Sequence, residues 1–304
     1  MTAAIRVICG PTAAGKSTIA MRLAERHGVT ILSADSRQVY RGFDVGTAKP
    51  TPAEARRVPH RGIDLVEPTE QYSAARWATD AAGWIDEALA AGREPVVVGG
   101  TGLYLRALFA PLFEEPPLEV ARRDALRREL DRWPTDELRR WCERLDPPRA
   151  RLGRAQLSRA VEIALLTGER LSELHARSPR AARHTARYLV VDPGPALGHW
   201  IESRAAAMID AGWPAEVERL AAAVPLGAPA WKATGYRTVA DFVHGRLDRA
   251  TMLRRIVIET RQYAKRQRTW FRHQLPADAV TLASPEDPRF LDVVDRWWTV
   301  EAEG

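Results

Sequence analysis

The chain has 304 residues, of which 45% are hydrophobic, and a formal net charge of +6. This length is enough for one large domain, or for a main domain that carries a smaller insertion, and the hydrophobic content can supply its core. The composition therefore favours a soluble globular enzyme. The positive charge comes mostly from arginine and is compatible with a polyanionic partner without requiring one.

The cysteines and the N-terminus argue against several classes of protein. Cys9 and Cys142 lie far apart and have no His or Cys at metal spacing, so neither a zinc site nor a disulfide framework is expected. The chain contains no uninterrupted apolar stretch of about 18 residues, the length that predicts a membrane span. It also begins directly with a strand and has no signal-like leader. We expect a cytoplasmic protein without membrane contact, and a monomer as the default.

Apolar runs in the first hundred residues predict β-strands over residues 5–9, 29–34 and 95–98. Helical periodicity fills the gaps between them. It is clearest over residues 73–91, where one face carries Trp77, Ala81, Trp84, Ile85 and Leu89. Strands and helices therefore alternate, which predicts an α/β fold with a parallel sheet flanked by helices on both faces.

The amino-acid composition and the hydrophobic pattern change over residues 113–187. This segment is rich in arginine, is interrupted by prolines, and has helical pattern without a strand signal. An apolar strand candidate returns at residues 188–191, and helices are expected from there to the end. We therefore predict an all-helical insertion domain at 113–187 within a catalytic core formed by residues 1–112 and 188–304.

A phosphate-binding loop lies between the first strand and a helix over residues 17–27. It matches the pattern G-x-x-x-x-G-K-[ST] with Gly10, Pro11, Thr12, Ala13, Ala14, Gly15, Lys16 and Ser17. Glycines let the backbone bend around phosphate oxygens, amides at the helix start point inward, and Lys16 adds a charge. The Ser17 hydroxyl is a ligand for Mg²⁺, the expected cofactor. The loop alone leaves NTP hydrolysis, kinase activity and diphosphate-dependent alkyl transfer open.

Two further segments follow predicted strands at their carboxyl ends. Asp35 comes directly after the second strand, and Thr101 lies in the turn Gly99–Tyr104 after the third. In a doubly wound sheet these ends line the ligand crevice, so both side chains are expected to face the phosphate loop. By itself, Asp35 could equally be a helix cap or a Mg²⁺ ligand, and residues 99–104 could be an ordinary tight turn.

At this point the sequence resembles the tRNA dimethylallyltransferases, also called tRNA isopentenyltransferases, of the bacterial type. The resemblance covers nearly the whole chain through six ordered motifs: residues 10–17, 35–40, 46–50, 59–64, 99–104 and 260–272. It implies a P-loop-type sheet and transfer of a dimethylallyl group from dimethylallyl diphosphate to N6 of the adenosine next to the anticodon on its 3′ side.

The resemblance also implies roles for individual residues. Asp35 is the expected general base, because a delocalised exocyclic amine is a poor nucleophile, and Thr101 is expected beside it. The diphosphate is expected on the phosphate loop, its amides and Mg²⁺, with Arg261 as a further ligand. The swung-out adenine is expected against Asp35, Thr101, Ser36, Arg37 and Gln38.

Two arginine-rich regions are candidates for binding the tRNA anticodon stem-loop. One is a predicted long helix with Arg254, Arg255, Arg261, Lys265, Arg266, Arg268 and Arg272. The other is the insertion, where the resemblance implicates Arg123, Gln156, Leu157, Ser158, Arg159 and Ala160. Without the resemblance, such charge runs are more often solvated helix faces.

Three alternative functions share some of these features. A small-molecule kinase would use the same loop with ATP and would turn ATP over without RNA. An adenylate dimethylallyltransferase would accept free AMP or ATP, although the large insertion favours a macromolecular acceptor. A passive RNA-binding protein would have no need for Lys16, Ser17 and Asp35 in one crevice.

Overall fold

A computed structural model describes residues 4–110, 118–177 and 182–299. The chain divides into two compact units: Met1–Phe109 together with Arg183–Gly304, and Ala110–Ala182. The sequence analysis predicted an insertion over residues 113–187, whereas residues 183–187 belong to the first unit. Each unit is described by itself below.

The first unit is built on a six-stranded sheet in which every neighbouring pair is parallel. From one edge to the other its strands are β3 (His60–Arg61), β2 (Val29–Ser33), β4 (Glu94–Gly99), β1 (Ile5–Cys9), β5 (Ala186–Val191) and β6 (Val280–Ala283). The predicted α/β class is confirmed. The expectation of helices only after residue 191 is wrong, because β6 pairs with β5 through Tyr188 to Val191.

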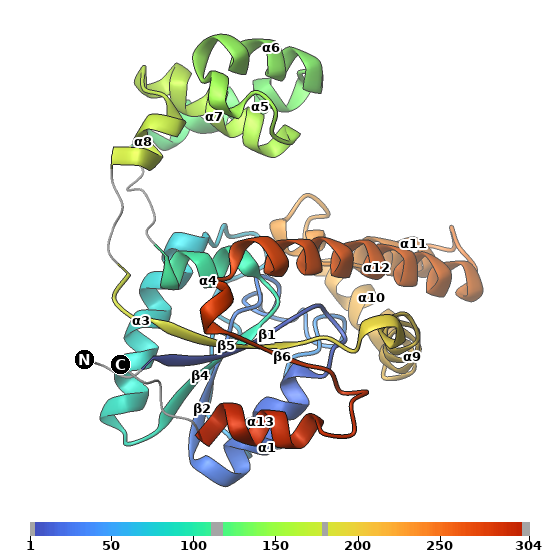
Figure 1. The fold of residues 1–304 in the computed structure, drawn as a ribbon. Coiled ribbons are helices and arrows are strands. Elements are labelled where there is room, and N and C mark those ends of the chain that lie inside the picture. The colour runs from blue at the N-terminus through green and yellow to red at the C-terminus, as the bar shows by residue number, and fades with distance from the viewer. Residues whose placement is uncertain (1–3, 111–117, 178–181, 300–304) are drawn as a thin grey trace. The chain divides into compact units, whose positions relative to one another are not determined.

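Helices cover both faces of this sheet (Figure 1). On one face lie α1 (Lys16–His27) and α13 (Phe290–Thr299), whose apolar side chains share a buried cluster with strand residues such as Ile8 and Val96. On the other lie α3 (Ala74–Ala90), α4 (Gly102–Phe109) and the long α12 (Arg249–Gln274). The unit therefore has three layers, with the sheet in the middle.

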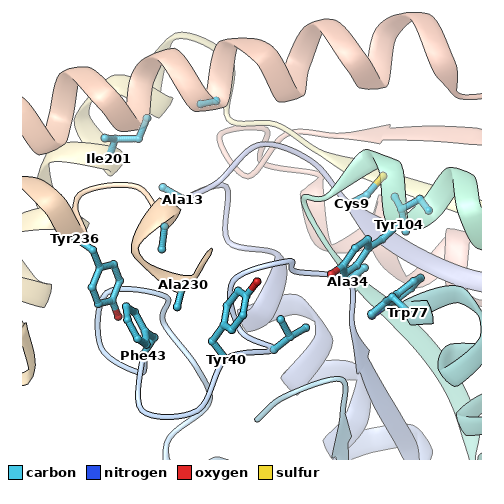
Figure 2. Close-up of a cluster of buried hydrophobic side chains, with 14 of the residues drawn as sticks. Cys9, Ala13, Ala34, Tyr40, Phe43, Trp77, Tyr104, Ile201, Ala230 and Tyr236 are labelled. Atoms are coloured by element: carbon cyan, nitrogen blue, oxygen red, sulfur yellow. The ribbon is translucent and has the colours of Figure 1, made fainter. Parts of the chain in front are cut away.

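The core on the α3 side is rich in aromatic residues. Figure 2 shows the ring of Tyr104 beside that of Trp77, and the two stack with centroids 4.7 Å apart. Of the predicted face of α3, Trp77, Ala81 and Ile85 are buried, but Leu89 is 48% exposed. A helix turns by about 100° per residue, so Leu89 lies about 120° from Trp77 and Ala88 takes the inward position instead.

The remaining elements complete the two units. In the first unit they are α2 (Pro52–Arg57), α9 (Leu197–Asp210), α10 (Trp213–Ala223), α11 (Tyr236–Val243) and the 3₁₀ turns Gly194–Ala196, Pro229–Lys232 and Ala277–Ala279. In the second they are α5 (Val120–Arg132), α6 (Thr135–Leu145), α7 (Arg154–Thr167), α8 (Leu171–Arg177) and the 3₁₀ turn Pro147–Arg149. Within its described residues the second unit is entirely helical, around a core that includes Leu138, Leu157 and Val161.

Candidate active site

The phosphate loop connects β1 to α1 and its shape depends on glycine. Gly10 has φ of +142°, and a Cβ at this position would lie 2.1 Å from the carbonyl oxygen of Val191 on β5. Gly15 adopts a left-handed conformation with φ of 85° directly before α1 begins. These two glycines let the loop turn closely over the sheet and present the N-terminus of α1, which is where anions bind.

Three groups of the loop have partners within the protein, one of them the Ala14 amide, which donates to the carbonyl oxygen of Pro11 at 3.4 Å. The Lys16 ammonium donates to the carbonyl oxygen of Pro11 at 2.7 Å, and the Thr12 amide donates to Oε1 of Gln267 at 2.8 Å. The expectation that the amides of the loop face the diphosphate is therefore wrong for Thr12. The Thr12 amide holds the loop to α12 instead.

Lys16 lies in an environment that lowers the pKa of its ammonium group. Burial and, to a smaller extent, the nearby Arg204 guanidinium together lower its pKa to about 8, against a smaller opposite effect of Asp35. Lys16 is therefore charged below pH 8 and increasingly neutral above it, and only the charged form attracts a diphosphate.

We predict that affinity for dimethylallyl diphosphate falls as the pH rises through about 8. The dissociation constant, measured by calorimetry with Mg²⁺ and without RNA, should be level between pH 7 and 7.5. Well above pH 8 it should rise towards about tenfold per pH unit, because one proton must be taken up for binding. The control is Lys16→Arg, which stays charged, so its dissociation constant should change little with pH. If the dissociation constant of the wild type changed equally little with pH, the proposed role of Lys16 would be contradicted.

Asp35 and Thr101 lie together at the ends of the adjacent strands β2 and β4. The Arg37 amide donates to Oδ1 of Asp35 at 2.8 Å, which fixes the carboxylate. The Ser36 amide donates to Oγ1 of Thr101 at 3.0 Å, so the two turns are tied to each other. The predicted convergence of a carboxylate and a hydroxyl beside the phosphate loop is therefore present in the structure.

Helix α12 adds a phenol to this pair that the sequence did not single out. Tyr263 lies close to Thr101, and its pKa is raised to about 12, mainly by burial and also by the Asp35 carboxylate. The phenol therefore stays protonated at neutral pH. Its position in the arginine-rich helix concealed it, because the surrounding charges suggested a solvated face.

Two pockets meet at this site. The first, here called the loop pocket, has a volume of about 370 Å³ and is lined by residues that include Gly15, Lys16 and Ser17. The second, the Asp35 pocket, has a volume of about 230 Å³ and is lined by Asp35, Tyr263 and apolar side chains such as Met208. Ala13 and Arg204 line both. A ligand can therefore extend from the phosphate loop to the Asp35 carboxylate.

Arg204 is the cation of this site that sequence reasoning missed. It lies on α9 between the buried residues Ile201 and Ala205, so it is an arginine on the inward face of an amphipathic helix. Burial lowers its pKa, and the Asp35 carboxylate raises it. The spacing of residues 201, 204 and 205 places Arg204 on the apolar face of the helix, and this was the signal in the sequence. Only the fold shows that this face borders the pockets.

Arg261, which was expected at the diphosphate, lies elsewhere. It is on the exposed side of α12, lines neither pocket, and donates to the carbonyl oxygen of Gly198 at 3.3 Å. Its guanidinium also lies 3.9 Å from the Glu202 carboxylate. Arg261 therefore borders neither pocket, whereas Arg204 borders both.

The residues expected around the adenine differ in whether their side chains are free to contact a ligand in the Asp35 pocket. Arg37 lines the Asp35 pocket. Gln38 does not, and its amide is fully engaged: Nε2 donates to the carbonyl oxygens of Thr47 and Ala48, and Oε1 accepts from Ser33. The expectation that Gln38 pairs with the adenine edge is therefore not supported, because all three hydrogen bonds would have to break. Gln38 instead fixes the turn at residues 47–48.

The exposed face of α12 carries a row of cations that we call the α12 row. Its exposed members are Arg254, Arg255, Arg261, Lys265, Arg266 and Arg272. Arg266 also lines the Asp35 pocket and lies over the Tyr263 ring. Arg268 is not part of the row, because it is paired with Asp192. The row thus reaches the mouth of the site.

In the second unit, the predicted tRNA contacts fall into two groups. The side chains of Leu157 and Ala160 are fully buried in the core of this unit, so they cannot touch a surface ligand and their prediction is corrected. Ser158 is half-buried, and Gln156 accepts from the Gly153 amide at the start of α7. Arg123 and Arg159 both pair with the buried Glu162, which also binds Arg127. These arginines keep a net positive charge at the surface.

Ser17, the predicted Mg²⁺ ligand, is exposed and lines the loop pocket. Among the described residues no group of three or more His, Cys, Asp or Glu side chains could hold a metal ion on its own. This donor set fits Mg²⁺ in the form that phosphate enzymes use, with few protein ligands and most of the coordination from phosphate and water. In the same part of the chain no helix is long and apolar enough to cross a membrane.

Comparisons with known proteins agree with this geometry. The chain matches the family described as IPP transferase over residues 38–274, and the family described as isopentenyl transferase over residues 3–61. It is 46% identical to a tRNA dimethylallyltransferase of Gloeobacter violaceus over 88% of this chain and 89% of that one, and 43% identical to one of Halorhodospira halophila over 90% and 91%.

Solved structures give the same result. A tRNA isopentenylpyrophosphate transferase of Staphylococcus epidermidis superposes with a TM-score of 0.67 at 27% identity, over 97% of both chains. A eukaryotic dimethylallyltransferase described as acting on tRNA has a TM-score of 0.79 at 24% identity, over 98% of this chain and 76% of that one, and supports the fold. The chain therefore belongs to the IPP transferase family, whose curated members similar to it are named tRNA dimethylallyltransferases.

Proposed function

We propose that this protein transfers the dimethylallyl group of dimethylallyl diphosphate to N6 of the adenosine on the 3′ side of the anticodon in tRNA. The observation that carries the proposal is the pair of pockets that join the phosphate loop to Asp35 and share Arg204. One end suits a diphosphate, and the other offers the Asp35 carboxylate to a nucleophile, with Tyr263 also in its lining.

In the proposed reaction, the bond between the allylic carbon and the diphosphate oxygen breaks, and its electron pair leaves with the diphosphate. The N6 lone pair forms the new carbon–nitrogen bond, and Asp35 takes the N6 proton. Oδ1 of Asp35 accepts from the Arg37 amide, which leaves Oδ2 for this proton. Thr101, which accepts from the Ser36 amide and has Tyr263 close by, is proposed to orient the amine.

The leaving diphosphate gains negative charge as the bond breaks. Lys16 and Arg204 supply two cations and the start of α1 supplies amides, all positioned before the reaction begins. Bound Mg²⁺, held by Ser17 and the diphosphate itself, would add Lewis-acid stabilisation of the leaving group.

The tRNA acceptor is proposed to lie along the α12 row. Its exposed cations suit a phosphate backbone, and Arg266 links the row to the Asp35 pocket. In the second unit, Arg123, Gln156, Ser158 and Arg159 stay predicted contacts, with Glu162 fixing the two arginines. The cytoplasmic location and the monomeric state also stay predictions.

Salt should weaken tRNA binding steeply if the α12 row contacts phosphates. With about five contacts, the logarithm of the association constant should fall with the logarithm of salt concentration at a slope of about −3.5 to −4.5. Lys265→Gln should make this slope shallower by about 0.7 to 0.9. The control is Arg26→Gln, which removes the same charge from α1 on the opposite face of the sheet. A slope unaffected by Lys265→Gln would exclude this contact.

The function itself is tested with labelled dimethylallyl diphosphate, Mg²⁺ and one of two acceptors. The acceptors are an unmodified anticodon stem-loop with an adenosine 3′ of the anticodon, and free AMP. Label in the stem-loop alone supports the proposal. Label in AMP alone would assign an adenylate dimethylallyltransferase, and label in neither, with ATP turnover in the absence of RNA, would assign a kinase.

A further inference from the structure

Gln267 is a buried side chain within the most strongly charged stretch of α12. Its residue is 6% exposed, whereas its neighbours Lys265 and Arg266 are exposed. Burying a primary amide is unfavourable unless its donor and acceptor groups find partners. Both ends of this amide have a partner, and neither partner belongs to α12.

The two partners are the two loops of the active site. Oε1 of Gln267 accepts a hydrogen bond from the Thr12 amide at 2.8 Å, and Nε2 donates to the carbonyl oxygen of Gly100 at 2.8 Å. Thr12 belongs to the phosphate loop, and Gly100 directly precedes Thr101. One side-chain amide therefore bridges the diphosphate-binding loop and the turn that carries the catalytic hydroxyl.

The space between these loops fits this amide and little else. A Cβ at Gly100 would lie 2.3 Å from Nε2 of Gln267 and 3.3 Å from the carbonyl oxygen of Gly10. Glycine at position 100 is therefore what allows the side chain to enter between the loops. A Cβ at Gly102 would likewise lie 2.2 Å from the Trp270 ring, one turn further along α12.

The polarity of the bridge is also fixed. The phosphate loop offers a donor, the Thr12 amide, and the turn offers an acceptor, the Gly100 carbonyl oxygen. An amide satisfies both at once, and so does a protonated carboxylic acid. A carboxylate would place two acceptors there and repel the Gly100 carbonyl oxygen. A methionine of similar size would satisfy neither.

We propose that Gln267 is a positioning residue that fixes the phosphate loop and the Thr101 turn relative to each other. It touches neither substrate and acts through Thr12 and Thr101; this inference rests on the proposed prenyl transfer. The diphosphate and the amine must be held in near-attack geometry, where a displacement of about 1 Å can cost on the order of 10² in rate. Loss of the bridge therefore lowers kcat more than it weakens donor binding.

The first test compares Gln267→Glu with the wild type between pH 5.5 and 8.5. Burial and the facing Gly100 carbonyl oxygen raise the pKa of the new carboxyl, so its protonated form is present at the acidic end. At pH 8.5 kcat should be about 10²-fold below the wild type. The ratio of the two kcat values should recover at least tenfold on acidification. Taking the ratio cancels any pH dependence that the two proteins share.

Two further variants separate positioning from other effects. Gln267→Met has no ionisable group, so its kcat should be low at every pH with a constant ratio to the wild type. Gln274→Glu makes the same chemical change on an exposed residue at the end of α12 and should keep a ratio near one. The KM for the donor should change by less than about threefold in Gln267→Glu.

Hydrogen exchange of the backbone amides provides a readout that does not depend on turnover. In Gln267→Met, peptides covering residues 10–17 and 99–104 should exchange faster than in the wild type, whereas residues 85–90 of α3 should not. Failure of the wild type to prenylate the stem-loop would remove the proposed function, and the exchange result would still decide whether Gln267 holds the loops.

Specific outcomes would overturn the inference. They are a pH-independent ratio for Gln267→Glu, wild-type turnover in Gln267→Met, and unchanged exchange in both loop peptides. Loss of cooperative unfolding in Gln267→Glu at both ends of the pH range would overturn it too, because the amide would then hold the whole fold rather than the site.

Discussion

Asp35→Asn is expected to lower kcat by on the order of 10² to 10⁴ while leaving stem-loop binding within about twofold. The substitution keeps the shape of the side chain and an acceptor for the Arg37 amide, so the turn at residues 35–37 should keep its geometry. What it removes is the group that takes the N6 proton. Single-turnover rates with excess enzyme measure the chemical step, and fluorescence anisotropy of a labelled stem-loop measures binding.

The control for Asp35→Asn is Asp86→Asn, the same change at a partly exposed residue of α3 whose carboxylate pairs with Arg183. It should leave both quantities unchanged. If Asp35→Asn weakened binding and turnover equally, the carboxylate would be a structural cap of the turn rather than a base. That result would leave Thr101 and Tyr263 as the groups to test next.

Features that depend on a local pattern could be predicted from the sequence. Strand β1 was predicted with its observed bounds, and the phosphate loop follows it as expected, because a buried strand, a glycine turn and an amphipathic helix each leave a mark within about ten residues. The convergence of Asp35 and Thr101 also followed, since both lie at carboxyl ends of strands that a parallel sheet brings together.

Features that depend on non-periodic contacts could not be predicted, whether the partner is distant, as for β6, or five to ten residues away, as for Gln38. Strand β6 has only four residues, of which Leu282 is 73% exposed, and it exists because β5 offers a free edge. Gln38 was assigned to the adenine because its side chain can pair with that base, but the fold gives it partners at Ser33 and residues 47–48 first. Neither outcome has a signal within the local sequence.

The arginines of the site could not be predicted from the sequence either. One predicted arginine lies outside the pockets, and one arginine that lines them was not predicted. Arg261 was placed in the site because of its motif, whereas its side chain lies on the outer face of α12 beside α9. Arg204 has no distinctive neighbours in the sequence, yet the face of α9 that carries it borders both pockets. A charge pattern predicts that a helix is basic, but the packing of the helix decides which charges reach the ligand.

The second large effect is expected for Arg204→Gln. Arg204 adds a cation to the two pockets that are proposed to hold the donor, and its loss should lower kcat/KM for dimethylallyl diphosphate by about 10² to 10³, or roughly 3 to 4 kcal/mol. Steady-state rates at saturating stem-loop measure this. The fold should persist, because Arg204 repels Lys16 and its removal relieves that repulsion.

Arg261→Gln is the matched control, since it removes the same charge from the outer side of α12. It should leave kcat/KM for the donor unchanged and affect only the salt dependence of tRNA binding. Equal losses in the two variants, or a loss confined to Arg261→Gln, would return the diphosphate contact to Arg261 and contradict the geometry of the pockets.

Arg204→Gln also makes a prediction for Lys16 that a purely structural effect would not produce. The Arg204 charge is one of the causes that lower the pKa of Lys16 to about 8, so its removal should raise that pKa. Donor binding by Arg204→Gln should be weaker at every pH, but its decline should begin at a higher pH than in the wild type. An unshifted decline would mean that the two cations do not sense each other, and therefore that they do not share one diphosphate.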